Sequence, residues 1–250
     1  MSRVIEKRIL ITGSGARGSI GRATALALAK EGADIAVHDL PSREDEAREV
    51  VEEVSAMGRR TCLLLGDLTD MGLCRRLVSE AISQLGQLDV LVNNAGSALY
   101  SEFIDVDEKT FDHQIALHLK APFFLAQEAA RHMLKRGQGK IINVSSELAY
   151  VGEPVHLPYS MAKGGLLTMT RSMALTLAPA IQVNAVAPGP TATDEFKESW
   201  EYNDEIRDAV PLKRFGTPDE VARSILFLAS SDGDIFTGQT LDPNGGTVMP

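Results

Sequence analysis

Cysteines, long apolar runs and clusters of basic residues are scarce in this chain, and their scarcity excludes several kinds of protein. Among 250 residues there are two cysteines, Cys62 and Cys74, without the paired spacing or neighbouring histidines of a zinc site. We therefore predict that both are reduced packing residues and that the protein binds no metal. No apolar stretch reaches the roughly 18 residues of a transmembrane helix, and the N-terminal residues do not form a secretion signal. We expect a cytoplasmic protein with no membrane partner.

The charge balance argues against a polyanionic partner. The chain has 25 lysines and arginines against 34 aspartates and glutamates, which gives a formal net charge of −9. A nucleic-acid backbone is itself strongly negative and would be repelled. With 44% hydrophobic and 24% charged residues, the composition is that of an ordinary folded protein. We expect no nucleic-acid partner.

The chain does contain a regular alternation of strand-like and helix-like segments. Strand-length apolar runs, each bounded by Gly, Asn, Asp or Pro, occur at 9–12, 34–37, 61–65, 88–92, 140–144 and 181–186. Helical patterns between them include 22–30, 44–57, 72–85 and 158–177. This alternation predicts one α/β domain over residues 1–250, a doubly wound parallel sheet with helices on both faces. Ligands of such sheets bind beyond the carboxyl ends of the strands.

A glycine-rich loop follows the first predicted strand. Residues 12–21 read Thr-Gly-Ser-Gly-Ala-Arg-Gly-Ser-Ile-Gly and lead into an Ala- and Leu-rich helix. Glycines let the backbone turn tightly and approach a pyrophosphate, whose charge then lies at the helix N-terminus. The loop predicts a dinucleotide-binding site, and a glycine-rich turn without a ligand is the alternative.

An acidic residue closes the second predicted strand. The Asp39 carboxylate is placed to accept hydrogen bonds from the adenosine ribose hydroxyls. A 2′-phosphate there would meet a like charge, so Asp39 favours NAD over NADP as the cofactor. Arg17 in the glycine-rich loop can offset this repulsion by pairing with the phosphate, which keeps NADP as an alternative. Asp67, after the third strand, is a candidate for binding the adenine; roles as turn or cap residues are the alternatives for both aspartates.

A tyrosine and a lysine stand four residues apart at the start of the long helical pattern. This spacing puts Tyr159 and Lys163 on one helix face, where the ammonium favours the phenolate. Tyr159 can then exchange a proton with a substrate oxygen that Ser146, after the fifth strand, also hydrogen-bonds. Taken alone, the Tyr–Lys pair is equally compatible with a surface pair.

Together and in this order, these motifs resemble those of the short-chain dehydrogenase/reductase family, over nearly the whole chain. Further markers are Asn93-Asn94-Ala95-Gly96, the Pro-Gly-Pro-Thr-Ala-Thr of 188–193, and the C-terminal segments 214–218, 237–239 and 245–246. The resemblance includes 3-oxoacyl carrier-protein reductases and sugar or alcohol dehydrogenases. It implies a Rossmann-type fold, usually a homotetramer, that transfers a hydride between a nicotinamide cofactor and a secondary alcohol or ketone.

The resemblance also implies a role for each matching residue. Ser146 would orient the substrate oxygen, Tyr159 would be the general acid/base, and Lys163 would lower the Tyr159 pKa and hold the nicotinamide ribose. The implied cofactor contacts, beside Tyr159 and Lys163, are Gly13, Ser14, Arg17, Ser19, Ile20, Asp39, Asp67, Leu68, Asn94, Ala95, Gly96, Pro188, Gly189, Thr191 and Thr193.

The chain departs from the family pattern in two places. The glycine-rich loop of residues 12–21, called the phosphate loop below, is two residues longer than usual in the family. Its Ser19-Ile20 is similar to the enoyl-reductase branch of the family. That branch places its tyrosine seven residues before the lysine, where this chain has His156, so enoyl reduction ranks below carbonyl chemistry. His118 stands where the family usually has the asparagine of its proton relay. Either the histidine makes the relay pH-sensitive, or it is a packing residue. A non-catalytic cofactor-binding scaffold or sensor is the remaining alternative.

The segment from about 190 to 212 is expected to form a helical lid over the nicotinamide. Glu147 and Glu153 add polarity to the expected pocket, which favours a polyol, a sugar or another hydroxylated substrate over a long acyl chain. The other candidate pocket residues are Ala98, Ala149, His156, Phe196 and Trp200.

Overall fold

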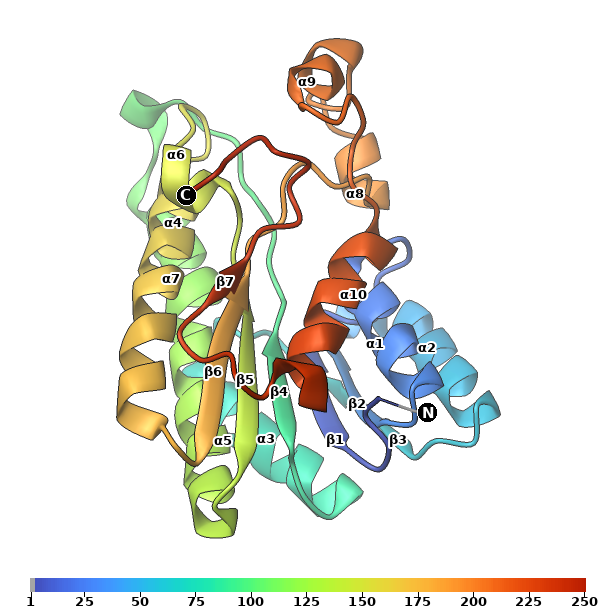
Figure 1. Cartoon of the computed structure of the whole chain (residues 1–250). Helices are drawn as coiled ribbons and strands as arrows, with labels where there is room; N and C mark the ends of the chain where they lie inside the picture. Colours follow the sequence, from blue (N-terminus) through green and yellow to red (C-terminus); the bar gives the residue numbers. More distant parts are fainter. Residues whose placement is uncertain (1–2) are drawn as a thin grey trace.

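Seven parallel strands form one sheet through the middle of the protein, seen in a computed structural model that describes residues 3–250 (Figure 1). Their order across the sheet is β3-β2-β1-β4-β5-β6-β7. The strands are β1 (Arg8–Thr12), β2 (Asp34–Asp39), β3 (Thr61–Leu65), β4 (Val90–Asn93), β5 (Gly139–Val144), β6 (Ile181–Val186) and β7 (Thr240–Leu241). The order reverses between β1 and β4, which opens a crevice for ligands at the carboxyl ends. The predicted Rossmann-type doubly wound sheet is confirmed.

Burial on both faces explains the nearly continuous apolar sequences of the strands. Side chains alternate between the two faces along a strand. In β1, Ile9 and Ile11 join the core on one face, while Leu10 joins the core on the other. All three side chains are fully buried. The central strand thus ends at Thr12 in a fixed register beside His38 of β2, and the loops that follow start from fixed positions.

Helices cover both faces of the sheet. α1, α2 and α10 pack on one face around residues such as Leu28, Val50 and Ile225, and α3, α5 and α7 cover the other around residues such as Leu77 and Leu125. The helices are α1 (Ile20–Lys30), α2 (Glu44–Ala56), α3 (Met71–Leu85), α4 (Glu108–Ile115), α5 (Ala121–Arg136), α6 (Leu148–Val151), α7 (Leu157–Leu177), α8 (Asp194–Lys197), α9 (Asp204–Ala209) and α10 (Pro218–Ala229). A π-helical turn, Ala116–Lys120, joins α4 to α5, and short 3-10 turns lie at Pro41–Arg43, Phe103–Asp105 and Ser231–Gly233.

Local sequence explains where the site-bearing helices begin. The Ser19 hydroxyl caps α1 by accepting a hydrogen bond from the Arg22 amide at 3.1 Å. α7 begins with Leu157-Pro158, and a proline is tolerated there because the first-turn amides lack helical partners. The phosphate loop therefore ends at a capped helix N-terminus, the usual place for an anion.

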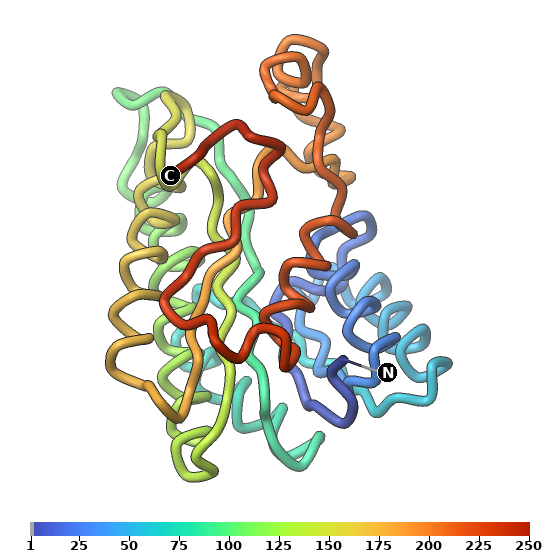
Figure 2. Tube along the Cα trace, in the orientation of Figure 1, coloured from blue at the N-terminus to red at the C-terminus, as the bar shows by residue number. Residues whose placement is uncertain are grey.

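The predicted segments agree with the observed elements to within two residues at each end. The strand β7 and the helices α4, α5, α6 and α10 were not predicted. The expected lid segment contains α8 and α9, which project beyond the carboxyl ends of the strands (Figures 1 and 2). The helical character predicted for that segment is therefore confirmed.

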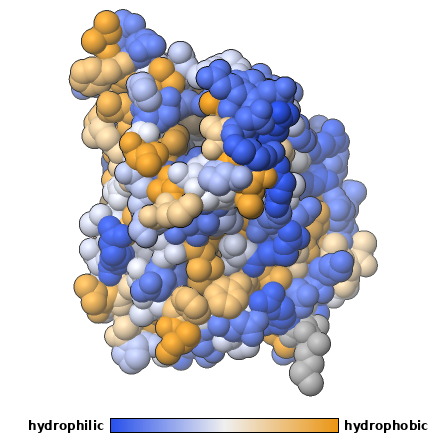
Figure 3. Space-filling model, turned by 45° about the horizontal axis from the view of Figure 1, so that its top comes forward, coloured by the Kyte–Doolittle hydropathy of each residue, from blue (hydrophilic) through white to orange (hydrophobic). Residues whose placement is uncertain are grey.

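The surface and the cysteines agree with the composition. Among residues 3–250, no helix is both long and apolar enough to cross a bilayer. Figure 3 shows hydrophobic residues in separate patches between hydrophilic ones. Cys62 and Cys74 are buried and unpaired, which confirms their predicted packing role. In the described part of the chain, no group of three or more His, Cys, Asp or Glu side chains is arranged to hold a metal ion.

Candidate active site

The proposed catalytic residues meet where β5 ends against α7. Ser146 follows β5, and Tyr159 and Lys163 lie one turn apart near the start of α7. The Lys163 ammonium nitrogen donates a hydrogen bond to the Val144 carbonyl at 2.7 Å and lies 5.5 Å from the centroid of the Tyr159 ring. The Ser145 hydroxyl in turn donates to the Lys163 carbonyl at 3.0 Å. These two bonds fix α7 on the end of β5 and set the position of the Tyr–Lys pair.

Burial dominates the electrostatics of this pair. It raises the pKa of Tyr159 to about 12, while a hydrogen bond with Ser146 acts in the opposite direction. Burial also lowers the pKa of Lys163 to about 7. Each charged form is unfavourable alone in this environment, so a phenolate here depends on a neighbouring cation. A protonated Lys163 supplies that charge next to the tyrosine ring.

His118 packs directly against Tyr159, the candidate general acid/base. It lies in the π-helical turn, is 1% exposed, and its ring meets the Tyr159 ring edge-on with centroids 4.9 Å apart. Its Nε2 contacts the Ser97 carbonyl at 2.9 Å, so this nitrogen carries the proton, whereas the buried Nδ1 has no partner among residues 3–250. Burial, together with the charge of Lys163, lowers the pKa of His118 to about 3. The ring is therefore neutral near pH 7, and the expectation of a relay that switches with physiological pH is not supported.

Gly96 makes room for the His118 ring. A Cβ atom added to Gly96 would lie 2.5 Å from Cε1 and 3.0 Å from Nδ1 of His118. Such distances are far inside van der Waals contact, so a side chain at position 96 and the ring at position 118 exclude each other. The family-like Asn-Ala-Gly segment and the unusual histidine are thus parts of one packing arrangement.

The loops after β1 and β4 are bonded to one another. Thr12 Oγ1 accepts hydrogen bonds from the amides of Asn94 and Ala95 at 2.9 and 3.0 Å. The Asn94 side chain donates to the carbonyls of Thr12 and Gly13 at 2.9 and 3.0 Å. Gly13 has a φ of 63°, and a Cβ atom there would lie 2.8 Å from the Ala95 Cα. We did not predict this role of the Thr12 side chain. A threonine at the end of a buried apolar strand does indicate that its hydroxyl hydrogen-bonds to a neighbouring loop.

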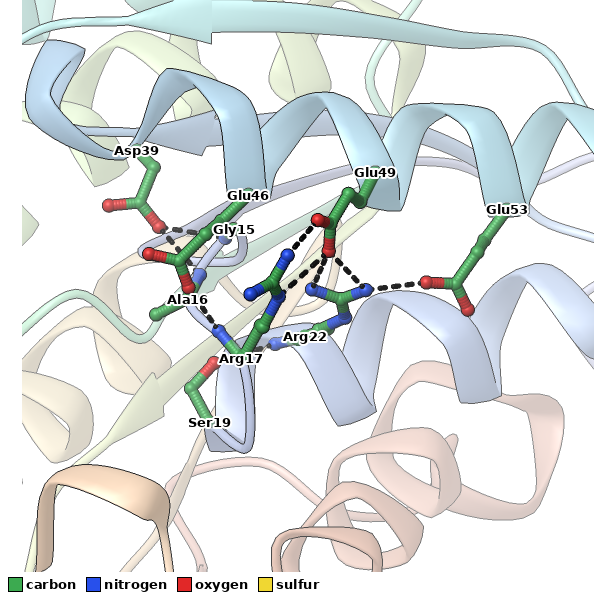
Figure 4. Close-up of polar contacts among 9 residues, drawn as sticks. All are labelled: Gly15, Ala16, Arg17, Ser19, Arg22, Asp39, Glu46, Glu49 and Glu53. Carbon is green, nitrogen blue, oxygen red and sulfur yellow. Dashed lines mark hydrogen bonds and ion pairs between the residues drawn. The ribbon is translucent and has the colours of Figure 1, made fainter.

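The phosphate loop itself is anchored by acidic residues. Asp39 ends β2 as predicted, but it is only 5% exposed. One carboxylate oxygen accepts from the amides of Gly15 and Ala16 at 2.7 and 3.3 Å, and the other accepts from the Leu40 amide at 2.8 Å. Asp39 therefore holds the loop in place through one of its carboxylate oxygens. The Arg17 guanidinium is paired with Glu49 and does not point to Asp39 (Figure 4).

Three other predicted contact residues have partners within the protein. Ser14 is fully buried, and its hydroxyl donates to the Ile11 carbonyl at 2.9 Å. Asp67 is exposed and accepts a hydrogen bond from the Thr69 amide at 2.8 Å, the turn role that was its alternative. The Leu68 side chain belongs to the core. Ser19 and Ile20, by contrast, form the N-terminus of α1 at the end of the loop.

The segment after β6 lies beside the candidate catalytic residues. The Pro188 carbonyl accepts a hydrogen bond from the Glu147 amide at 3.0 Å, next to Ser146. Thr191 Oγ1 donates to the Gly189 carbonyl at 2.8 Å, and Thr193 caps α8. The lid begins against the phosphate loop, since a Cβ atom on Gly18 would lie 2.2 Å from the carboxyl carbon of Asp194. The segment after β6 thus runs from the neighbourhood of Ser146 to the phosphate loop. It contains Pro188, Gly189, Thr191 and Thr193.

A series of aromatic ring contacts runs from Trp200, in the expected lid segment, to Tyr159. Trp200 meets Tyr100 edge-on, Tyr100 meets His156, and His156 meets Tyr159, with centroid distances of 5.8, 6.0 and 6.4 Å. The His156 Nδ1 lies 2.9 Å from a Glu153 carboxylate oxygen. Tyr100 escaped prediction because it follows β4 in an irregular loop with no periodic pattern. Phe196 packs instead on Tyr202 and Phe215.

Glu147 is a buried acid next to Ser146. Its carboxylate accepts a hydrogen bond from the Thr247 hydroxyl in the C-terminal segment. Burial raises the pKa of Glu147, and the hydrogen bond from Thr247 acts against that rise. Glu147 thus places a buried polar group next to Ser146.

These residues fit a nicotinamide dinucleotide. The glycines at the close approach of two loops leave room for a ligand backbone, the capped N-terminus of α1 suits a pyrophosphate, and the Tyr–Lys pair lies at the opposite end of the same crevice.

Known proteins are similar to this chain in sequence and in structure. The sequence model of a family described as enoyl-(acyl carrier protein) reductase matches residues 13–248. The 3-oxoacyl-[acyl-carrier-protein] reductase FabG of Staphylococcus aureus strain Mu50 is 39% identical over 247 residues, covering 98% of this chain and 99% of that protein.

Two solved structures extend the comparison. A short-chain dehydrogenase of Burkholderia cenocepacia J2315 in complex with NADP is 33% identical, with a TM-score of 0.92, over 98% of this chain and 99% of that one. Acetoin dehydrogenase from Enterobacter cloacae is 35% identical, with a TM-score of 0.89, over 97% and 96% of the two chains. With its sheet order and its ordered motifs, the chain belongs to the short-chain dehydrogenase/reductase family, the NAD(P)-dependent oxidoreductases that act on CH–OH and C=O groups.

Proposed function

We propose that this enzyme interconverts a secondary alcohol and a ketone on a small hydroxylated substrate, with NAD as its preferred cofactor and Tyr159 as general acid/base. The observation that carries the proposal is the convergence of Ser146, Tyr159 and Lys163 at the carboxyl end of β5, across the crevice from the phosphate loop. Family members with this arrangement transfer a hydride and a proton to or from one carbon–oxygen bond. The bound nicotinamide supplies or accepts the hydride.

The protein side chains would bind the substrate oxygen, transfer the proton and position the cofactor ribose. Ser146 donates a hydrogen bond to the substrate oxygen, and Tyr159 gives that oxygen a proton or takes one from it. Lys163 keeps one N–H on the Val144 carbonyl and has two others free, one to hold the nicotinamide ribose and one to place its charge by the tyrosine. The neutral His118 ring supports Tyr159 from the side, and its unpartnered Nδ1 is an acceptor for a relay water.

The cofactor would lie along the crevice between the two ends already described. The residues proposed to hold it are Gly13, Ser14, Arg17, Ser19, Ile20, Asp39, Asp67, Leu68, Asn94, Ala95, Gly96, Tyr159, Lys163, Pro188, Gly189, Thr191 and Thr193. For Ser14 and Leu68 the contact would come from the backbone or from shape alone, since their side chains are buried.

The pocket walls support a polar substrate. Glu147 is buried beside Ser146, and the Glu153–His156 pair lies beside Tyr159. A long acyl chain offers these polar groups no hydrogen bonds, whereas a substrate with a second hydroxyl or carbonyl can hydrogen-bond to them. The relatives named above include a 3-oxoacyl-[acyl-carrier-protein] reductase and an acetoin dehydrogenase, so both a long acyl substrate and a small oxygen-rich one are alternatives. The polar groups near Ser146 and Tyr159 favour the smaller, oxygen-rich substrate.

A substrate panel tests the proposal directly. Polyols, sugars and 2-hydroxyketones would be offered with NAD⁺ and NADP⁺, and 3-oxoacyl and enoyl thioesters with NADH and NADPH, with absorbance at the nicotinamide band as readout. We expect turnover of oxygen-rich alcohols or ketones that Tyr159→Phe reduces by at least about 100-fold without loss of NADH binding. Turnover only of enoyl thioesters would favour the enoyl-reductase alternative. Cofactor binding with no turnover of any class would favour the scaffold.

We further propose that the enzyme is a homotetramer, as is usual in the family. Large apolar side chains are exposed on α4, α5 and α7, among them Phe111, Phe123 and Met161. A shallow groove lined by Ile115, Leu119, Phe123 and Met169 lies on the same face. Exposed apolar surface of this kind is typical of subunit contacts. Light scattering coupled to gel filtration would give about four times the 27.0 kDa chain mass if the proposal holds.

A further inference from the structure

We propose that Glu49 sets the cofactor preference of this enzyme by holding Arg17 away from the position of a 2′-phosphate. This inference rests on the proposed function, because it requires NAD(P) on the phosphate loop. Glu49 would be a second determinant of cofactor preference beside Asp39. It lies ten residues further along the chain, in α2.

The geometry of the pair is specific. Glu49 receives the Arg17 side chain through two nitrogens, Nε at 3.1 Å and Nη2, in a forked arrangement (Figure 4). The Arg17 amide also donates to Glu46 at 2.8 Å. Both acids lie on the first turns of α2, which packs on the loop closely enough that a Cβ atom on Gly15 would lie 2.6 Å from the Ala47 Cβ. The loop is thus tied to α2 at its backbone and at its one arginine.

Glu49 is itself braced in position. The Arg22 guanidinium in α1 donates to it at 3.1 and 3.2 Å and donates to Glu53 at 2.6 Å (Figure 4). The two arginines lower the pKa of Glu49 to about 2, so the carboxylate is charged at neutral pH. Arg22 is anchored on α1, the helix that follows the loop. Arg17 is therefore bound to a fixed carboxylate and not to a freely moving one.

Two features at this end of the crevice disfavour a 2′-phosphate: the Asp39 carboxylate, and the pairing of Arg17 with Glu49. The 2′-hydroxyl of a bound adenosine lies at the acid that closes β2, and Asp39 already contacts the loop at Gly15 and Ala16. Arg17 follows these residues directly and is the cation that a 2′-phosphate there would recruit. While Arg17 is neutralised by Glu49, the phosphate meets carboxylates without a compensating cation. NAD lacks the phosphate and avoids this cost.

Two other arginines lie close by in the sequence, and Arg48 is paired with Glu44. Arg43 precedes α2 and forms no ion pair among residues 3–250. An experiment on Glu49 must therefore show that any gain in NADPH binding comes through Arg17. Removing Arg17 in the same background supplies that distinction.

The test compares binding of NADH and NADPH by nicotinamide fluorescence in four proteins. They are the unaltered enzyme, Glu49→Gln, Glu53→Gln and the double variant Arg17→Ala/Glu49→Gln. Glu53→Gln is the matched control, because it removes the same charge one helical turn away and touches Arg22 alone. Because the Arg17–Glu49 pair is solvent-exposed, we expect Glu49→Gln to tighten NADPH binding by about threefold to fivefold and to change NADH binding by less than about twofold. The Glu53→Gln protein keeps the original preference, and the double variant loses the gain.

Three results would overturn the inference. The first is an unchanged NADPH affinity in Glu49→Gln. The second is an equal gain in Glu53→Gln, and the third is a gain that persists without Arg17; both would mean that net charge or Arg43 decides the preference. If the unaltered enzyme binds neither nucleotide, the proposed function fails together with this inference, whereas a failure confined to the variants leaves the proposed function standing.

Discussion

Replacing Gly96 by alanine should damage both the fold and the active site, because the added methyl group collides with His118. The new Cβ would lie 2.5 Å from Cε1 of a ring that is 1% exposed. The ring cannot turn away freely, since its Nε2 is bonded to the Ser97 carbonyl and its edge rests on the Tyr159 ring at 4.9 Å. Overpacking of this kind costs about 1–3 kcal/mol of unfolding free energy.

The magnitude has a direct readout in stability and in turnover. For a chain of this size, about 1 kcal/mol corresponds to a Tm shift of about 2–4 °C, so Gly96→Ala should lower Tm by about 2–12 °C. Relief of the clash by moving His118 would displace Tyr159, so kcat should fall even at temperatures where the variant is folded. Differential scanning fluorimetry and steady-state kinetics below the transition measure the two effects separately.

A double-mutant cycle with His118→Asn tests the cause. Asparagine is smaller than histidine, so the methyl group of Gly96→Ala should be better tolerated in that background, with a coupling of about 1 kcal/mol or more. If Gly96→Ala is as stable as the unaltered enzyme, or is equally damaging with asparagine at 118, the proposed packing of these two positions is wrong.

Three further predictions follow from the pKa shifts. Lys163→Met removes the cation beside a tyrosine whose pKa burial has raised to about 12, so kcat at pH 7 should fall at least about 100-fold and recover partly as pH rises; a loss under about twofold would contradict this. His118→Asn should leave the shape of the pH–rate profile between pH 5 and 8 unchanged, because the pKa of about 3 keeps the ring neutral throughout. Burial lowers the pKa of His38 to about 4 as well, so the unfolded chain binds protons on both histidines before the folded one does. As the pH is lowered from about 6.5 to 4, the unfolding free energy measured by urea titration should therefore fall. The expected slope is up to about 1.4 kcal/mol per pH unit for each histidine. A free energy that does not change with pH over this range would be inconsistent with two buried neutral histidines.

The architecture was predictable because it depends on local and periodic signals. Strands buried on both faces need continuous apolar sequences, and β3 and β6 were predicted with their observed bounds. β7 was not, because a two-residue strand that pairs only with β6 has no length over which a pattern can develop. The lid was predicted as helical from its place in the family pattern, but its two short helices have little periodicity of their own.

The residues of the candidate active site could be proposed from the sequence, but their contacts could not. Ser146, Tyr159 and Lys163 were identified from sequence, while the bond from Lys163 to Val144 depends on how α7 meets β5. The neutrality of His118 depends on burial, which no motif reports. Arg17 and Glu49 are 32 residues apart, and only the packing of α2 on the phosphate loop brings them together.

The two departures from the family pattern should act independently, because they lie at opposite ends of the crevice. The lengthened loop is held by Glu49 through Arg17 and Arg22, whereas His118 contacts Gly96, Ser97 and Tyr159. In the part of the chain that the structure describes, no residue hydrogen-bonds or stacks with both Glu49 and His118.

Effects of substitutions without shared partners usually add within about 0.5 kcal/mol. Glu49→Gln/His118→Asn should therefore show the altered NADPH-to-NADH binding ratio of the first change and the kcat of the second, each within about twofold. Fluorescence titration gives the ratio, and steady-state kinetics with saturating NADH gives kcat. If His118→Asn alone alters the nucleotide ratio, or the double variant departs from additivity by more than that margin, the loop and the relay position communicate through the bound cofactor, and the separation inferred from their contacts fails.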